Sequence, residues 1–320
     1  MEALFERVKT GGEVVPDSQM YNAVLAAYSS HSRMEAASRL VREMRGAGCT
    51  PTAVTYNTLI ALYSRIGRVK EAEAALRQMQ EAGLQPSVVT YTSLLVAYGK
   101  QGRAEEAQAV FRDMLCCKIR PTVATYTALL DAYGKAGQVE NAELIFREMR
   151  KNKCRPTEYT YIALIAAYCR DGAMDRAAAI LPRMKRSDCQ VTVYAYNALL
   201  HGFRELRDAP GAAATFEELH LEGVEANVVT YTLMIGAYSE VGDEESCLST
   251  YRRMLAAGVA ADKEVDKALL EACRDGEHKE EALALIRGMG PTKPLHAPIF
   301  EIQNNHNLEE GNVENIVAMN

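Results

Sequence analysis

The apolar positions along the chain follow the spacing of helices rather than that of strands. Residues 53–87 contain two apolar stripes with spacings of three and four residues, the first formed by Tyr56, Leu59, Ile60 and Tyr63 and the second by Val69, Ala72, Leu76 and Met79. Gly67 separates the stripes, and Gly83 and Pro86 follow the second, as expected beyond a helix C-terminus. This pattern predicts two helices joined by a tight turn.

The same pattern returns every 35 residues. Its clearest mark is an anchor tyrosine in the first helix of each unit: Tyr21, Tyr56, Tyr91, Tyr126, Tyr161, Tyr196 and Tyr231. A second aromatic residue follows each anchor by seven residues. Because neither helix of a unit can cover its apolar face alone, neighbouring units must stack and share a core. The sequence therefore predicts an all-α solenoid of helix pairs.

The period also divides the chain. Residues 1–17 fit the second helix of a truncated preceding unit, and residues 18–262 hold seven full units. Residues 263–290 read as a degenerate capping repeat, in which Asp266 replaces the anchor tyrosine, and residues 291–320 as a mostly disordered tail. In the fifth unit, Pro182 lies inside the second helix, where it predicts a kink.

Composition and charge limit the classes of function that the chain can have. The chain is 48% hydrophobic with a net charge of −6, so a nucleic-acid site would have to be a local patch. It has no apolar run long enough to span a membrane, and its first residues predict neither a signal nor a transit peptide.

His220-Leu-Glu222 matches half of a zinc deaminase signature and is predicted to lie at the surface. The eight cysteines lack metal-site spacing, and Cys49, Cys154 and Cys189 are expected in the core. We expect no enzyme and no cofactor.

Several segments resemble the pentatricopeptide repeat. They are Val-Val-Thr-Tyr-Thr at 88–92, Thr-Tyr-Asn-Thr-Leu-Ile at 55–60, Ala-Tyr-Gly-Lys-Ala-Gly at 132–137 and Glu-Asn-Ala-Glu-Leu-Ile-Phe-Arg-Glu-Met at 140–149. The uniform length is similar to the P-type class. The resemblance implies a right-handed superhelical solenoid that binds single-stranded RNA in mitochondria or chloroplasts, one base per repeat. Its implied role is RNA stabilisation, processing, splicing or translation without catalysis.

The resemblance implies two base-reading positions in each repeat. The first, here called the reading residue, follows the anchor tyrosine: Asn22, Asn57, Thr92, Thr127, Ile162, Asn197 and Thr232. The second, the closing residue, ends the repeat: Thr52, Ser87, Thr122, Thr157, Thr192, Asn227 and Asp262. All of these except Ile162 can form hydrogen bonds with a base edge. An alternative, compatible interpretation is that the closing residues cap helices.

Two further sets of residues complete the implied site. Residues two before the anchor tyrosines would pack on the bases, namely Val54, Val89, Tyr159, Tyr194 and Val229, with Gln19 and Ala124 in the remaining repeats. Residues two after the second aromatic would contact phosphates, namely Arg65, Lys100, Lys135 and Arg170. The same position is acidic later in the chain, at Glu205 and Glu240.

The family's pairing of residues with bases gives a predicted target of 5′-YCRRnYG-3′, with n opposite Ile162. The alternative is a protein–protein scaffold, a subunit of an organellar ribosome or RNA polymerase assembly. The acidic C-terminal end would then hold protein partners.

Overall fold

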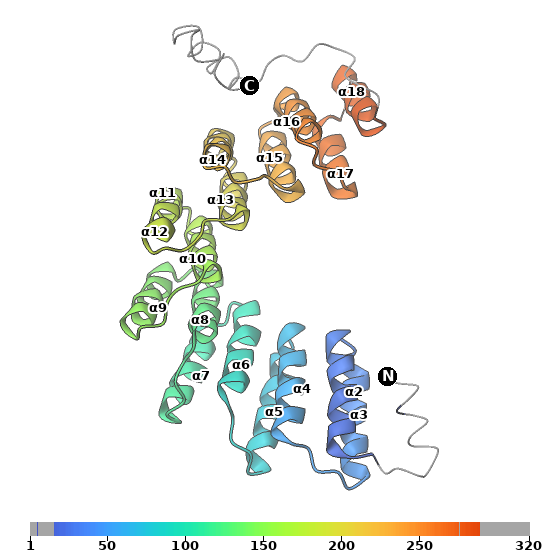
Figure 1. The fold of residues 1–320 in the computed structure, drawn as a ribbon, viewed down its shortest axis with the longest axis vertical. Helices are drawn as coiled ribbons and strands as arrows, with labels where there is room; N and C mark the ends of the chain where they lie inside the picture. Colours follow the sequence, from blue (N-terminus) through green and yellow to red (C-terminus); the bar gives the residue numbers. More distant parts are fainter. Residues whose placement is uncertain (1–4, 6–15, 275, 289–320) are drawn as a thin grey trace, which may run out of the picture. The chain divides into compact units, whose positions relative to one another are not determined.

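The computed structural model describes Phe5, residues 16–274 and residues 276–288, and every regular element in that part of the chain is a helix (Figure 1). The first helices of successive pairs are α2 (Ser18–Ser30), α4 (Ala53–Arg65), α6 (Val88–Lys100), α8 (Val123–Lys135), α10 (Glu158–Arg170), α13 (Val193–Glu205), α15 (Val228–Glu240) and α17 (Lys263–Ala272). The second helices are α3 (Met34–Gly46), α5 (Val69–Glu81), α7 (Ala104–Cys116), α9 (Val139–Lys151), α11 (Met174–Ala178) with α12 (Ile180–Arg186), α14 (Ala209–Leu221), α16 (Glu244–Ala256) and α18 (Gly276–Ile286). The predicted all-α array of helix pairs is confirmed.

The chain forms two compact units, residues 1–191 and residues 192–320. Within the first unit, α4 packs between α2 and α6, and α8 packs between α6 and α10. Each second helix from α3 to α9 contacts its own first helix and the first helix of the next pair. Within the second unit, α15 packs in the same way between α13 and α17. Each unit therefore has a layer of first helices beside a layer of second helices.

The turn inside each pair is built on one backbone conformation. Gly67 has a φ of 73°, and its N–H donates to Ser64 O at 3.2 Å, which closes the end of α4. A side chain is strained in this left-handed region, so glycine is preferred there. Ser32 and Arg207 nonetheless hold the corresponding turns with φ values of 55° and 57°.

Aromatic contacts between successive repeats form much of the core. Tyr126 lies against Phe111 of the preceding second helix, with ring centroids 5.5 Å apart, and Tyr161 lies against Phe146 in the same way at 5.4 Å. All four rings are buried. Because these anchor tyrosines contact the second helix before them, they join the apolar cores of successive repeats within the first unit.

The second helix of the fifth pair is interrupted at Ala179, which separates α11 from α12. Pro182 has no N–H to donate to the carbonyl of Ala178, and its ring crowds that carbonyl. The helix is therefore interrupted where the proline was expected to disturb it, and the kink itself remains a prediction. Arg183, the next residue, places its guanidinium 4.4 Å from the centre of the Phe146 ring.

The two ends of the chain are described only in part. Most of residues 1–17 and all of residues 291–320 lie outside the described residues, so the expected truncated helix and disordered tail remain predictions. Phe5 is buried and meets Tyr21 edge to face at 5.1 Å. In α17, Asp266 accepts a 2.6 Å hydrogen bond from Tyr251 Oη, so the residue that replaces the anchor tyrosine is bonded within its unit. Among the described helices, none has the length and apolar character needed to cross a membrane.

Candidate nucleic-acid interface

The reading and closing residues of one repeat lie side by side although they are 30 residues apart in sequence. Asn22 Nδ2 donates to Thr52 Oγ1 at 3.2 Å, and Asn197 Nδ2 donates to Asn227 Oδ1 at 3.4 Å. The stacking of first helices produces this arrangement, because the closing residue begins the helix that packs beside the reading residue. Two polar side chains of each such repeat can therefore approach one base together.

The closing residues are also helix N-caps, as the alternative interpretation expected. Thr52, Ser87, Thr122, Thr157 and Asn227 each form a capping box with the threonine three residues later. Thr192 accepts from Tyr194 N, and Asp262 Oδ1 accepts from Glu264 N and Val265 N, both at 2.9 Å. Capping satisfies exposed backbone donors at the helix start and holds these side chains in place.

A third set of polar residues joins these two positions and was missed in the sequence. It consists of the third residue of five repeats, here called the bridging threonines: Thr55, Thr90, Thr125, Thr160 and Thr230. Each is 0% exposed, and each contacts the reading residue of the preceding repeat at 2.6–2.9 Å. The signal that could have found them is the same 35-residue period, which they follow except at Met20, Ala195 and Val265.

The residues expected to pack on bases project into solvent. Val54 and Val89 are both 58% exposed, Val229 is 51% exposed, and Tyr194 and Tyr159 are 63% and 77% exposed. Gln19 and Ala124 are exposed too. Large apolar side chains that recur at one place in successive repeats form an uncovered surface able to pack against flat rings.

The four predicted phosphate-binding cations differ in what they contact. Arg65 Nη1 donates to Ser29 O at 2.6 Å, and Lys100 Nζ donates to Arg65 O. Each carbonyl belongs to the end of the preceding first helix, where a positive charge is favourable. Lys135 instead forms an ion pair with Asp131 on its own helix, with Nζ and Oδ2 2.5 Å apart. These contacts compete with phosphate binding to different degrees.

Family models for the pentatricopeptide repeat match residues 16–61, 51–98, 75–136, 121–165, 161–205 and 229–259. The chain belongs to the pentatricopeptide repeat family. The crystal structure of the pentatricopeptide repeat protein PPR10 from maize is 30% identical, with a TM-score of 0.67 over 86% of this chain and 40% of that one. This pentatricopeptide repeat chain therefore spans less than half of the PPR10 chain.

Two RNA complexes are more distant structural matches. One is PPR10 with an 18-nt psaJ RNA element, at 23% identity and a TM-score of 0.44, covering 92% of this chain and 53% of that one. The other is the pentatricopeptide repeat domain of Arabidopsis thaliana protein-only RNase P 1 with tRNA, at 21% identity and a TM-score of 0.44, covering 53% and 90%. No curated protein matches the chain in sequence.

The cysteines of this pentatricopeptide repeat protein are only partly as expected. Cys49, Cys154 and Cys189 are half-buried at the loops between repeats, and of the three Cys49 is shown packing against a core cluster, so the expectation of full burial in the core is wrong. Short side chains at a loop between two helices leave one side open to solvent. Cys247 is fully buried, and this burial raises the pKa of its thiol to about 12. No group of three potential metal ligands occurs among the described residues.

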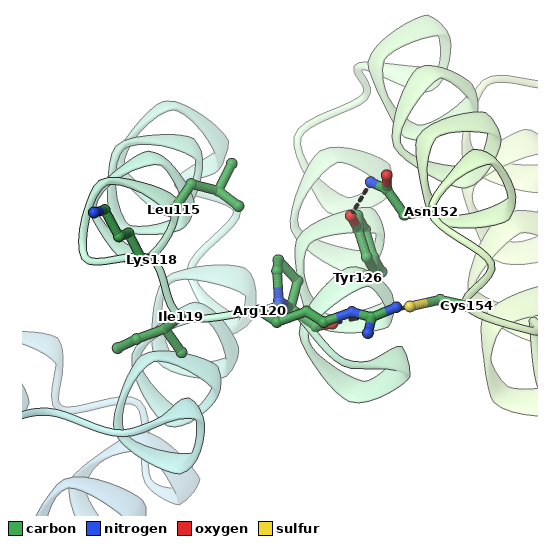
Figure 2. A pocket seen from close by; sticks show the side chains of 8 residues that line it. Leu115, Lys118, Ile119, Arg120, Tyr126, Asn152 and Cys154 are labelled. Atoms are coloured by element: carbon green, nitrogen blue, oxygen red, sulfur yellow. Dashed lines mark hydrogen bonds between the residues drawn. The ribbon is translucent and has the colours of Figure 1, made fainter.

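A cavity of about 300 Å³ lies at the loop before α8. Figure 2 shows the Arg120 side chain extending from this loop toward Cys154, beside a 2.7 Å hydrogen bond from Asn152 Nδ2 to Tyr126 Oη. None of these four residues is a reading, closing or bridging residue. The cavity is a gap at the junction of two repeats.

His220 is half-buried, contrary to its expected position on the surface. Its ring meets Phe216 edge to face at 4.7 Å. Burial is the main cause that lowers the pKa of His220, and the nearby Arg253 lowers this pKa further. Glu222 is exposed, so the two residues of the partial zinc signature lie in different surroundings.

Proposed function

We propose that this protein binds single-stranded RNA in a sequence-specific way, with one base per repeat. The observation that carries the proposal is the pairing of reading and closing residues, with an exposed apolar or aromatic residue in the same repeat. Stacking on the exposed side chain would supply affinity, and hydrogen bonds from the paired polar residues would supply selectivity. The maize relative supports this proposal, because PPR10 has been crystallised with an 18-nt psaJ RNA element.

The proposed role is that of an RNA-binding adaptor in a mitochondrion or chloroplast. By covering one stretch of transcript, it would affect RNA stability, processing, splicing or translation without chemistry of its own. Pentatricopeptide repeats also occur in an RNase, protein-only RNase P 1. In the proposed adaptor, the repeats alone select the target.

The test is binding to RNAs that contain the proposed core, 5′-YCRRnYG-3′. A matched RNA should bind far more tightly than a scrambled RNA of the same composition at moderate salt, measured by fluorescence anisotropy. A selection from random RNA should recover the C and the G five bases apart. Equal, weak binding of both RNAs would refute the proposal and favour a protein–protein scaffold, with partners at the acidic end near Glu240.

A further inference from the structure

The bridging threonines connect three groups in a fixed order. Thr90 Oγ1 accepts from the backbone N–H of Ser87 at 2.9 Å and contacts Asn57 Oδ1 at 2.6 Å. Thr55, Thr125, Thr160 and Thr230 likewise accept from the backbone N–H of the closing residue before them, at 3.0–3.3 Å. A short chain of hydrogen bonds therefore runs from the backbone to the reading residue.

The backbone group sets the direction of this chain. An N–H can only donate, so the threonine oxygen accepts, and one hydroxyl proton remains for it to give. Two oxygens compete for that proton: Asn57 Oδ1 lies 2.6 Å from Thr90 Oγ1, whereas Ser87 Oγ lies 3.2 Å away. A typical O–H···O distance is about 2.7–2.8 Å, so the proton is directed at Asn57.

The other bridging threonines show the same preference. Thr160 Oγ1 lies 2.8 Å from the reading residue Thr127 and 3.3 Å from the closing residue Thr157. Thr230 Oγ1 lies 2.8 Å from Asn197 Oδ1 and 3.1 Å from Asn227 Oδ1. In each case the oxygen of the reading residue is the nearer of the two.

This direction decides what each reading residue can offer to a base. When its Oδ1 accepts a hydrogen bond from the threonine, an asparagine such as Asn57 presents its Nδ2 donors to the RNA. A flip of the side-chain amide would break that hydrogen bond. A donor suits a base with a carbonyl at its pairing edge, which cytosine, uracil and guanine have and adenine lacks. By the same argument, a reading threonine such as Thr127 would accept from its bridging threonine and keep its own proton to donate.

We propose that the bridging threonines are positioning residues that determine which hydrogen-bonding group each reading residue presents to RNA. This inference rests on the proposed function. It adds a third residue to five of the seven proposed base-binding units, contributed by the repeat that follows.

The seventh repeat supplies an internal comparison. The third position of the next helix pair holds Val265, which has no hydroxyl. The reading residue of this repeat, Thr232, donates its proton to Val228 O of its own helix at 2.8 Å. Its donor is therefore used inside the protein, and this repeat should discriminate bases less than the second repeat does.

The test compares Thr90→Val with Thr90→Ser and with Thr58→Val. Thr58 lies on α4 beside Asn57, and its hydroxyl donates to Val54 O of its own helix at 2.8 Å, so Thr58→Val makes the same chemical change outside the chain of bonds. The readout is the ratio of Kd values for RNAs with A or C opposite the second repeat. Thermal unfolding checks that each variant folds.

Thr90→Val should lower the preference for C over A about fivefold, which corresponds to a hydrogen bond of about 1 kcal/mol. Thr90→Ser and Thr58→Val should keep the wild-type ratio. An unchanged ratio in folded Thr90→Val, or a loss equal to that in Thr58→Val, would overturn the inference. If the wild-type protein bound no RNA, the proposed function would fail first, and the inference with it.

The reverse substitution, Val265→Thr, tests the same idea by gain of selectivity. The new hydroxyl would occupy the position that the bridging threonines hold in the other repeats. Thr232 would then be free to face the RNA. The preference of this variant among bases at the seventh position should sharpen by a similar factor. A variant that folds and binds RNA without any change in that preference would contradict the proposal.

Discussion

The salt dependence of RNA affinity should depend on what each of the four predicted phosphate-binding cations contacts in the protein without RNA. We consider two variants: Arg65, Lys100, Lys135 and Arg170 all replaced by Gln, and Asp131→Asn alone. The first removes all the predicted cations. The second removes only the partner of Lys135, whose Nζ lies 2.5 Å from Asp131 Oδ2.

The expected slopes follow from the release of counterions. The logarithm of affinity for a single strand falls with the logarithm of salt concentration by about 0.7 per phosphate contact. Lys135 is already neutralised by Asp131, so three cations remain to replace counterions, and the slope should be about −2.1. Between 50 and 200 mM salt, the wild-type affinity should then fall about 18-fold. With Lys135 released, Asp131→Asn should give a slope of about −2.8 and a fall of about 50-fold.

The assay is fluorescence anisotropy with a matched RNA at several salt concentrations. The four-Gln variant should have a much flatter slope with the same base preference. Thermal unfolding is needed beside it, because Arg65 and Lys100 also bond the ends of preceding helices. A matched control replaces Arg42, Arg77, Arg112 and Arg147, four exposed cations in the same 35-residue register on the second helices.

Three results would refute this reasoning. A slope unaltered by the four Gln substitutions would put the phosphate contacts elsewhere. An equal loss of slope in the control variant would mean that total charge, and not position, governs binding. An unchanged slope in Asp131→Asn would show that the ion pair does not restrain Lys135.

Three further predictions concern single side chains. Tyr159→Ala should lower RNA affinity about 5- to 150-fold, as expected for the loss of one stacking contact of about 1–3 kcal/mol. The melting temperature should not change, because the Tyr159 side chain is 77% exposed. Burial lowers the pKa of His220 in the folded protein, so the unfolded state binds the proton more tightly. The free energy of unfolding, measured in urea, should therefore decrease as the pH falls through about 6.5. His220→Leu should weaken this pH dependence. Iodoacetamide at pH 8 should modify the exposed Cys116 and Cys117, as detected by mass spectrometry. It should leave Cys247 unmodified, because this thiol is buried and its pKa is about 12. Labelling of Cys247 in the folded protein would contradict its burial.

The sequence predicted the helix pairs well because their cause is local. Stripes such as Tyr56 to Tyr63 and turns such as that at Gly67 each follow from a few neighbouring residues. The interruption before Pro182 has an equally local cause, the missing backbone donor. Repetition then strengthened the signal, because every unit carries the same pattern.

The contacts between repeats were less predictable because they join residues about one repeat apart. The period gave the place of Lys100 but not its bond to the carbonyl of Arg65, which is 35 residues away. Thr90 by itself carries no distinct signal in the sequence, since a threonine in a helix can also pack beside apolar residues. Its role became visible only when Asn57 was placed beside it. The half-exposure of Cys154 likewise depends on how two repeats meet at a loop.

The proposed role of the bridging threonines gives the repeating unit of folding and the repeating unit of recognition different limits. The second helix pair begins at Ala53, whereas its proposed set of hydrogen-bonding residues begins at Asn57 and is completed only by Thr90. An exchange of residues 53–87 between two such proteins would therefore separate Asn57 from its threonine whenever the recipient carried another residue at that place. An exchange of residues 57–90 would transfer the reading residue, the closing Ser87 and the bridging threonine together. Modular redesign of this array should place its junctions inside the first helices rather than in the loops.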